Sequence, residues 1–201
     1  MISRVLIPIF SLISLWTFAA DAPVRPPCCR SLPGGQPAES SLYQLESVWT
    51  SDVGTRTRLG VFRGRPQIVA LFFTHCEYAC PILVSELKRL EQALPADLRE
   101  RVDFLLISFD SARDTPAQLA DYRRVHELDL AHWSLLRGEV DDVRELAALL
   151  GVNYRADARG QFAHSNVITV LDAEGSIARQ FTGLKLPVDD VIKVLSGPKK
   201  P

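Results

Sequence analysis

The apolar run QIVALFF, residues 67–73, constrains the fold more than any other stretch of this sequence. Pro66 bounds the run on one side, and a segment with two closely spaced cysteines follows on the other. Its length and its β-branched residues are typical of a strand buried in the centre of a sheet. Apolar residues then recur at helical spacing from Ile82 to Leu94, after Pro81, which suits the first position of a helix. A buried strand that runs directly into a helix predicts an α/β domain.

The rest of the chain adds strands and helices to this core. The other predicted strands are 102–109, 165–172 and 176–181, and the other predicted helices run from 114 or 115 to about 128, from 139 to 150 and from 187 to 195. Segments 47–50 and 56–61 flank a turn and predict an additional N-terminal β-hairpin. We therefore expect a thioredoxin-like α/β fold, with a mixed central sheet flanked by helices on both faces and an inserted helix.

The N-terminal part of the chain has a different composition. An apolar run at 5–20 is shorter than the ~20 residues of a spanning helix. Small residues follow it, so residues 1–22 are predicted to be a signal peptide, with an uncleaved membrane anchor as the alternative. Residues 23–41 are rich in Pro, Gly and Ser and predict a flexible linker, which leaves 42–201 as the folded domain. Either export signal predicts an extracytoplasmic location, in a bacterium the periplasm.

Composition narrows the classes of partner. Of the 201 residues, 47% are hydrophobic, enough for one core, and the net charge of −1 gives no global attraction to nucleic acid or to a membrane surface. We expect a monomer that contacts a membrane only through the N-terminal segment, if that segment is retained. The four cysteines form two tight groups, Cys28–Cys29 and Cys76–Cys80, which indicates local chemistry more than a long-range disulfide framework.

Cys76 and Cys80 lie where the predicted strand 67–73 meets the next helix. Such a loop is a common location for active sites in open α/β sheets, and a helix N-terminus favours the thiolate form of a cysteine. Three residues separate the two cysteines, whereas a thioredoxin-type redox pair normally has two between them. The spacing leaves open a redox-active pair that forms a disulfide, a metal site, or a structural disulfide, which would constrain the unfolded chain little.

One of the four histidines stands near this loop. His164 precedes strand 165–172, which we expect beside strand 67–73, so its side chain can reach the cysteines. Two thiolates and one imidazole form a soft three-coordinate set suited to copper, Cu(I) especially. No proline precedes strand 165–172, which argues against general disulfide exchange. His75 adjoins Cys76 and can tune it, whereas His126 and His132 are expected to be solvated.

Three separated segments together resemble the Sco (SenC) family of thioredoxin-like copper proteins. They are FFTHCEYACP, ISFDSARDTP and FAHSNVITVLDAEGSIARQFTG. The family pattern is Cys-x-x-x-Cys-Pro, then Asp-x-x-x-Asp-Thr-Pro, then a distal histidine. It is matched here by Cys76, Cys80 and Pro81, by Asp110, Asp114, Thr115 and Pro116, and by His164. The resemblance covers about Leu42 to Leu195.

The resemblance implies a copper chaperone. The resemblance implies that copper, as Cu(I) or Cu(II), would be bound by Cys76, Cys80 and His164. The partner would be a copper-acceptor protein, expected to be a subunit of cytochrome c oxidase. The chaperone would either fill the copper site of that subunit or keep its cysteines reduced. The family usually has Pro-Asp followed by Val or Ile between the cysteines, where this chain has Glu77-Tyr78-Ala79. The loop therefore differs in shape and charge, as in a divergent member serving another copper target. Asp110 is expected to cap the turn after its strand, or to orient a ligand or a partner.

Other functions compete with this one. A metallochaperone turns over no small molecule, so the chain is expected not to be an enzyme; the alternative is an extracytoplasmic thiol–disulfide oxidoreductase using Cys76 and Cys80. A peroxidase of the peroxiredoxin type would have its attacking cysteine in a Pro-x-x-x-Thr/Ser-x-x-Cys motif, which residues 72–76 do not show. A binding module with an inactive site is the least specific alternative. Cys28 and Cys29 are interpreted as passive exposed thiols, with a copper-collecting, lipid-attachment or partner-directed redox role as alternatives.

Overall fold

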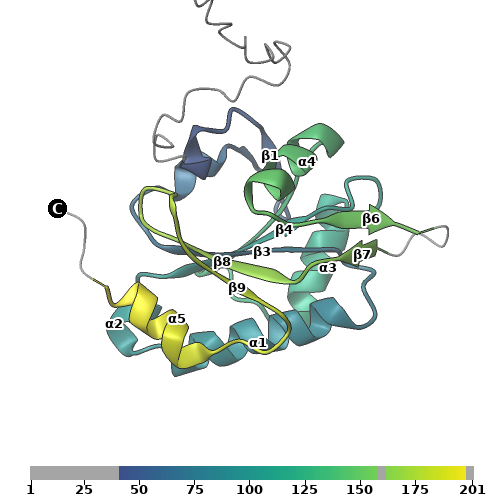
Figure 1. Cartoon of the computed structure of the whole chain (residues 1–201). Helices are drawn as coiled ribbons and strands as arrows, with labels where there is room; N and C mark the ends of the chain where they lie inside the picture. The colour runs from purple at the N-terminus through teal and green to yellow at the C-terminus, as the bar shows by residue number, and fades with distance from the viewer. Residues whose placement is uncertain (1–40, 158–161, 198–201) are drawn as a thin grey trace, which may run out of the picture. The chain divides into compact units, whose positions relative to one another are not determined.

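A seven-stranded mixed sheet runs through the domain in the computed structural model, which describes residues 41–157 and 162–197 (Figure 1). The strand order is β2-β1-β5-β4-β3-β8-β9. The strands are β1 Trp49–Ser51, β2 Arg56–Thr57, β3 Gln67–Phe72, β4 Asp103–Ser108, β5 Trp133–Arg137, β8 Val167–Leu171 and β9 Ile177–Thr182. A separate two-stranded sheet pairs β6 Tyr154–Ala156 with β7 Phe162–His164. The predicted thioredoxin-like fold, with its extra N-terminal hairpin β1–β2, is confirmed.

Helices cover both faces of this sheet. They are α1 Ala79–Ala93, α2 Ala96–Arg99, α3 Pro116–His126, α4 Val140–Leu149 and α5 Val188–Leu195, with 3₁₀ turns η2 Leu42–Gln44 and η3 Leu59–Phe62. In Figure 1, α1 and α5 lie below the sheet and α4 lies above it. No helix within the described parts of the chain is long and apolar enough to cross a membrane. The signal peptide or anchor predicted for 1–22, and the linker up to residue 40 with Cys28 and Cys29, lie outside the described residues.

Strand β3 is the centre of the core and positions the cysteine loop. It pairs in parallel with β4 and antiparallel with β8, and all six of its residues are buried. Burial on both faces explains its unbroken apolar sequence. The carboxyl ends of β3 and β4 leave the sheet together, because the Phe109 amide donates to the Phe72 carbonyl at 3.0 Å. The segments after both strands therefore meet at one edge of the sheet, and the strand next to β3 on its other side is β8, as predicted.

A buried ion pair fastens the N-terminal hairpin to α3. The Arg123 guanidinium donates to both carboxylate oxygens of Asp52, and the two side chains are 11% and 3% exposed. Arg123 also donates to the backbone carbonyls of Leu128, Asp129 and Trp133. Each charge is thus fully hydrogen-bonded, which is the condition for burying an ion pair without a large penalty.

The structure corrects the predicted strands in several places. Strand β5, between α3 and α4, was not predicted, although it lies between β4 and β1 in the sheet and pairs in parallel with β4. The β6–β7 hairpin was not predicted either. The predicted strand 56–61 is strand only at β2, because η3 follows it.

The start of α1 also differs from the prediction. The helix begins at Ala79, so Pro81 occupies its third position and not its first. Pro81 is tolerated there because the first turn of a helix has no intrahelical acceptor for its amides. Cys80 accordingly lies inside the first turn.

Candidate metal centre

A buried carboxylate fixes the segment that leads into the cysteine loop. Asp114, fully buried before α3, accepts the Thr74 amide at 3.0 Å and the Thr74 hydroxyl. The Ser108 hydroxyl, at the end of β4, donates to the same carboxylate. The Cys76 amide then donates to the Phe73 carbonyl at 3.3 Å and closes a turn. The loop therefore starts from a fixed position.

The sulfur of Cys76 caps the helix that contains Cys80. The N-cap residue of α1, Tyr78, makes no side-chain capping hydrogen bond. Instead, the Cys80 amide donates to Cys76 Sγ at 3.3 Å, in the role that a Ser or Asp side chain usually has at a helix start. Both cysteines carry free thiols. Cys80 is fully buried, whereas Cys76 is partly exposed.

The two thiols have opposite acidities. The hydrogen bond from the Cys80 side chain, together with amides at the start of α1, lowers the pKa of Cys76 to about 5. The same hydrogen bond and burial raise the pKa of Cys80 far above its usual range. At neutral pH the pair therefore holds one proton, with the negative charge on the exposed Cys76 sulfur.

His164 faces this pair with a defined tautomer. It ends β7 and pairs with Tyr154 of β6. Its Nδ1 lies 3.2 Å from the Ser165 carbonyl oxygen. A carbonyl only accepts hydrogen bonds, so in the neutral ring the proton is on Nδ1. The lone pair on Nε2 is then available to a metal.

Aromatic side chains support the imidazole ring from behind. The His164 ring centroid lies 5.1 Å from that of Phe109 and 6.3 Å from that of Phe73. Phe162 packs against both phenylalanines in edge-to-face geometry, and Tyr154 stacks on Phe109 at 5.0 Å. We call Phe73, Phe109, Tyr154 and Phe162 the aromatic cluster. It fixes the orientation of the ring by packing.

The three side chains predicted to bind metal lie together. One ligand atom from each of Cys76, Cys80 and His164 lies within 4.8 Å of the other two. Bonds of about 2.0–2.3 Å to one ion separate two ligand atoms by at most about 4.6 Å, so only a small adjustment is needed to hold an ion. Two sulfurs and one imidazole nitrogen are the donors that copper prefers among common metals. Cys76 and His164 line an open hollow of about 710 Å³, whereas Cys80 is fully buried.

The other predicted polar residues near the loop have structural contacts. His75 turns away from Cys76, with Nδ1 3.0 Å from the Thr74 hydroxyl and 3.7 Å from Asp114. Asp110 accepts the Arg113 amide and its guanidinium, so it caps the turn after β4. His75, Asp110 and Asp114 do form a second group of possible ligands within 4.8 Å. Both of its carboxylates already accept hydrogen bonds, and that of Asp110 is paired with a cation, which opposes metal binding.

Two histidines expected to be solvated are not. His126 is half-buried against Tyr122, with ring centroids 4.2 Å apart, and burial lowers its pKa. His132 is also half-buried, and its Nδ1 lies 3.1 Å from the Asp103 carboxylate. Both serve packing and pairing, so neither changes the candidate ligand set.

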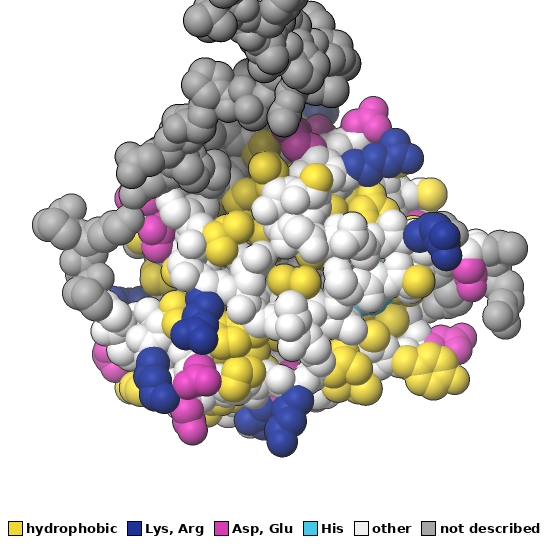
Figure 2. Space-filling view, viewed as in Figure 1, with side chains coloured by type: hydrophobic (Ala, Val, Ile, Leu, Met, Phe, Trp, Pro, Cys, Tyr) yellow, Lys and Arg dark blue, Asp and Glu magenta, His cyan; other side chains and the backbone are white. Residues whose placement is uncertain are grey.

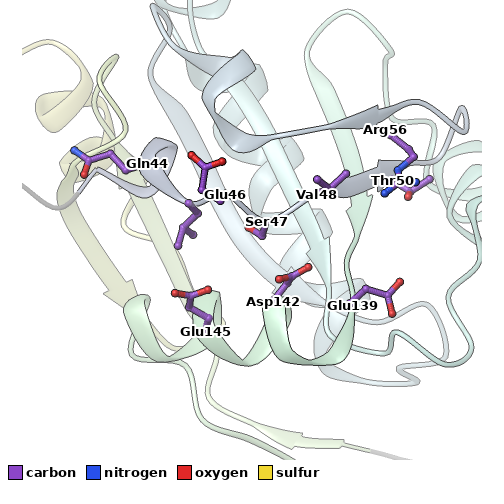
Figure 3. A pocket seen from close by; sticks show the side chains of 10 residues that line it. Gln44, Glu46, Ser47, Val48, Thr50, Arg56, Glu139, Asp142 and Glu145 are labelled. Carbon is purple, nitrogen blue, oxygen red and sulfur yellow. The ribbon is translucent and has the colours of Figure 1, made fainter.

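A second hollow, of about 780 Å³, lies between residues 44–50 and α4 (Figure 3). Its lining includes the carboxylates of Glu46, Glu139, Asp142 and Glu145 and the guanidinium of Arg56. No thiol or imidazole is among the described residues that line it. This hollow therefore lacks the soft donors of the Cys76–Cys80–His164 trio.

Two supporting features of the centre were not predicted. Asp114 was recognised as a possible helix start and as part of the family motif, but its contact was not predicted: its carboxylate holds Thr74 in place. The aromatic cluster was missed because Tyr154 and Phe162 lie on strands that were not predicted. Their alternation with polar residues in 154–162 was the available signal.

Comparisons with known proteins agree with this geometry. The sequence pattern of the SCO1/SenC family matches residues 39–197. A protein of Stutzerimonas stutzeri, named as a candidate copper-binding protein, is 32% identical over 163 residues, which cover 79% of this chain and 77% of the relative.

Solved structures share the fold at lower identity. A SCO1/SenC family lipoprotein from Bacillus anthracis superposes with a TM-score of 0.69 at 21% identity, covering 77% of this chain and 94% of that one. Bradyrhizobium japonicum ScoI, solved with copper bound, superposes with a TM-score of 0.63 at 22% identity, covering 74% and 94%. With the family pattern matched over nearly the whole described region, this chain belongs to the SCO1/SenC family.

Proposed function

We propose that this protein is a copper metallochaperone that holds one copper ion through Cys76 Sγ, Cys80 Sγ and His164 Nε2 and passes it to an acceptor protein. The observation that carries the proposal is the convergence of these three soft ligand atoms, two of which belong to residues that line an open hollow. The copper bound to Bradyrhizobium japonicum ScoI and the name of the Stutzerimonas stutzeri relative support copper as the cargo.

Unequal burial of the ligands favours transfer by ligand exchange. The exposed Cys76 thiolate meets an incoming ion first, and the buried Cys80 thiol must then lose its proton to bind. On release, an acceptor thiolate can approach from the hollow and replace Cys76 while Cys80 still holds the ion. Because binding releases a proton, copper affinity should rise with pH.

The acceptor that fits best is a copper site of cytochrome c oxidase, outside the cytoplasm. This follows from the Sco-like motifs of the chain, and the lipoprotein relative from Bacillus anthracis supports an extracytoplasmic location. The N-terminal segment would then export or anchor the protein. To test this assignment, the copper-loaded protein is mixed with a purified copper-free oxidase subunit, and copper transfer is followed by the absorption spectrum of the copper site of that subunit.

A copper(I) titration tests the binding step. The reduced protein, its His164→Ala variant and a His75→Ala control are titrated against a competing Cu(I) chelator. We expect one-to-one binding that weakens markedly on loss of His164 and is unchanged on loss of His75, because His75 faces Asp114. Equal affinity of all three proteins would contradict the proposed ligand set.

A thiol–disulfide oxidoreductase is the second candidate, favoured by the exposed thiolate beside a buried thiol. Cys76 would attack a target disulfide, forming a mixed disulfide and releasing one target thiolate. Cys80 would then lose its proton and attack the Cys76 sulfur, releasing the second thiolate; the target gains two electrons and this protein ends as the disulfide. This reaction does not use His164, so survival of reductase activity in His164→Ala, with weak copper binding by the wild type, would favour it.

A further inference from the structure

Two large apolar side chains stand in solvent at the start of α1. Tyr78 is 79% exposed and Ile82 is 46% exposed. Tyr78 is the N-cap residue of α1, and Ile82 lies four residues later in the first turn of that helix. Figure 2 shows hydrophobic side chains beside acidic ones at the right-hand edge of the molecule, where Figure 1 places the start of α1 and strand β7. We call Tyr78 and Ile82 the apolar patch.

The apolar patch borders the route to the metal ligands. Tyr78 lies between the two cysteines in sequence and lines the same hollow as Cys76 and His164. An acceptor atom that reaches Cys76 through this hollow must therefore pass beside the Tyr78 ring. Tyr78 therefore shares one surface with two of the proposed copper ligands, Cys76 and His164.

The charged side chains that line the hollow are acidic, and one cation, Arg113, lies over the ring of the lining residue Phe162, 5.9 Å from its centroid. Glu77 and Asp157 line it, and no Lys or Arg is among its described lining residues. Glu77 is exposed, next to the apolar patch. A partner surface with a Lys or Arg opposite Glu77 would gain both orientation and association rate, whereas an acidic surface would be repelled.

We propose that Tyr78 and Ile82 form the docking surface for the copper acceptor, a folded protein whose metal ligands lie in an apolar surface with a Lys or Arg facing Glu77. The inference rests on the proposed chaperone function and names the kind of partner it serves. Exposed aromatic residues are typical anchors of protein interfaces, because they bury a large rigid surface with little loss of side-chain entropy. A small thiol would gain little from such anchors, so the apolar patch favours a protein over a small-molecule acceptor.

The test compares copper transfer to a protein with transfer to a small molecule. The Cu(I)-loaded full chain, its Tyr78→Ser/Ile82→Ser variant and a Val125→Ser/Leu130→Ser control are mixed with the reduced apo copper-site domain of a bacterial cytochrome c oxidase subunit. Parallel samples receive a Cu(I) chelator. Val125 and Leu130 are 66% and 65% exposed and line no part of the hollow, so the control removes a similar apolar surface elsewhere.

The proposal expects a selective loss. Transfer to the oxidase domain should slow about tenfold or more in the variant of the apolar patch, as for loss of an interface anchor, and should be unchanged in the control. Copper affinity and transfer to the chelator should not change, because neither side chain is among the three that supply ligand atoms. Glu77→Lys should slow protein transfer further at low salt.

Each other outcome identifies which claim fails. Equal protein transfer by all variants would overturn the docking surface and leave the chaperone function intact. Equal slowing to protein and chelator would mean a distorted loop, which also overturns the docking role. If the wild type binds copper but delivers none to the oxidase domain, the proposed delivery fails and the docking surface falls with it. Faster transfer in Glu77→Lys would overturn the basic partner.

Discussion

The Asp52–Arg123 pair and the Cys76–Cys80–His164 trio both join distant parts of the chain through polar side chains, but only one of them is saturated. Arg123 donates hydrogen bonds to both carboxylate oxygens of Asp52 and to three backbone carbonyls. The trio instead aims two sulfurs and an imidazole nitrogen at one another, within 4.8 Å, beside an open hollow.

The difference separates a structural junction from a binding site. A buried pair whose hydrogen bonds are all made has no free donor or acceptor for a ligand, and its removal lowers the stability of the fold. Two sulfurs and an imidazole nitrogen that converge, with one proton held between the two cysteines, form a ligand set, and removal of any of them should weaken metal binding. If this distinction is right, substitutions in the trio should change copper binding, and substitutions in the ion pair should change stability.

The acidity of Cys76 gives the largest expected effect. Its pKa is lowered to about 5, so the thiolate is present above that pH, and the iodoacetamide rate of the apo protein should rise through pH 5 and level off by neutral pH. For an ordinary thiol, the alkylation rate would rise around pH ~8.5, the usual pKa of cysteine. The rate is followed by mass spectrometry of the reduced protein between pH 4 and 9.

Cys80→Ala is the matched control for this profile. The hydrogen bond from the Cys80 side chain is the main cause of the low pKa, so its removal should move the profile toward that of an ordinary thiol. A wild-type rate that still climbs between pH 7 and 9, or a Cys80→Ala profile that does not move, would contradict the shared proton.

Arg123→Met should cost the most stability. It leaves the Asp52 carboxylate buried without its partner, and loss of one member of a buried pair lowers the free energy of unfolding by about 3–5 kcal/mol. Urea denaturation followed by tryptophan fluorescence measures this. Copper affinity of the folded variant should be unchanged.

The matched control is the neighbouring exposed pair. Arg124 contacts Asp121 at 3.3 Å with side chains 74% and 67% exposed, so Arg124→Met should cost well under about 1 kcal/mol. Similar losses in both variants would mean that burial does not distinguish the two pairs.

Cys80→Ser should show the opposite pattern to Arg123→Met, with a large loss of copper affinity and a smaller loss of stability. It keeps the size of a buried side chain near the start of α1 but removes a soft ligand, so Cu(I) affinity should fall by more than the ~100-fold typical of losing an outer-shell group. Stability should change less than in Arg123→Met, because the backbone amide of residue 80 still donates to Cys76. A chelator competition and a urea curve on the same sample measure both quantities. Retained affinity would remove Cys80 from the ligand set.

The sequence predicted the centre of this molecule better than its periphery. Strand β3 was readable because burial on both faces demands an unbroken apolar run. The position of His164 followed from the hairpin that places β8 beside β3. Strand β5 was missed because it carries Ser134, Arg137 and two leucines, which have no strong preference for strands, although the sheet buries three of its five residues.

Contacts made by particular side chains account for the features that the sequence did not predict. Pro81 seemed to mark the first residue of α1, but the sulfur of Cys76 caps the helix two residues earlier, and no local pattern encodes a sulfur cap. Asp114 reaches Thr74 across 40 positions of sequence. The contact between Asp114 and Thr74 depends on how β3 and β4 end side by side, which is a property of the sheet and not of either segment.

Phe109→Leu should change both stability and copper binding, and its expected effects are the smallest. Phe109 is buried and backs the His164 ring at 5.1 Å. Its replacement should lower stability by about 1–2 kcal/mol, because Leu leaves part of the volume of the buried ring unfilled, and copper affinity by about tenfold, because the imidazole loses part of its support. Phe104→Leu is the control, since Phe104 stacks on Trp133 at 4.4 Å within the same sheet but away from the trio. It should lose similar stability and no affinity, and equal affinities in the two variants would show that the aromatic cluster serves folding alone.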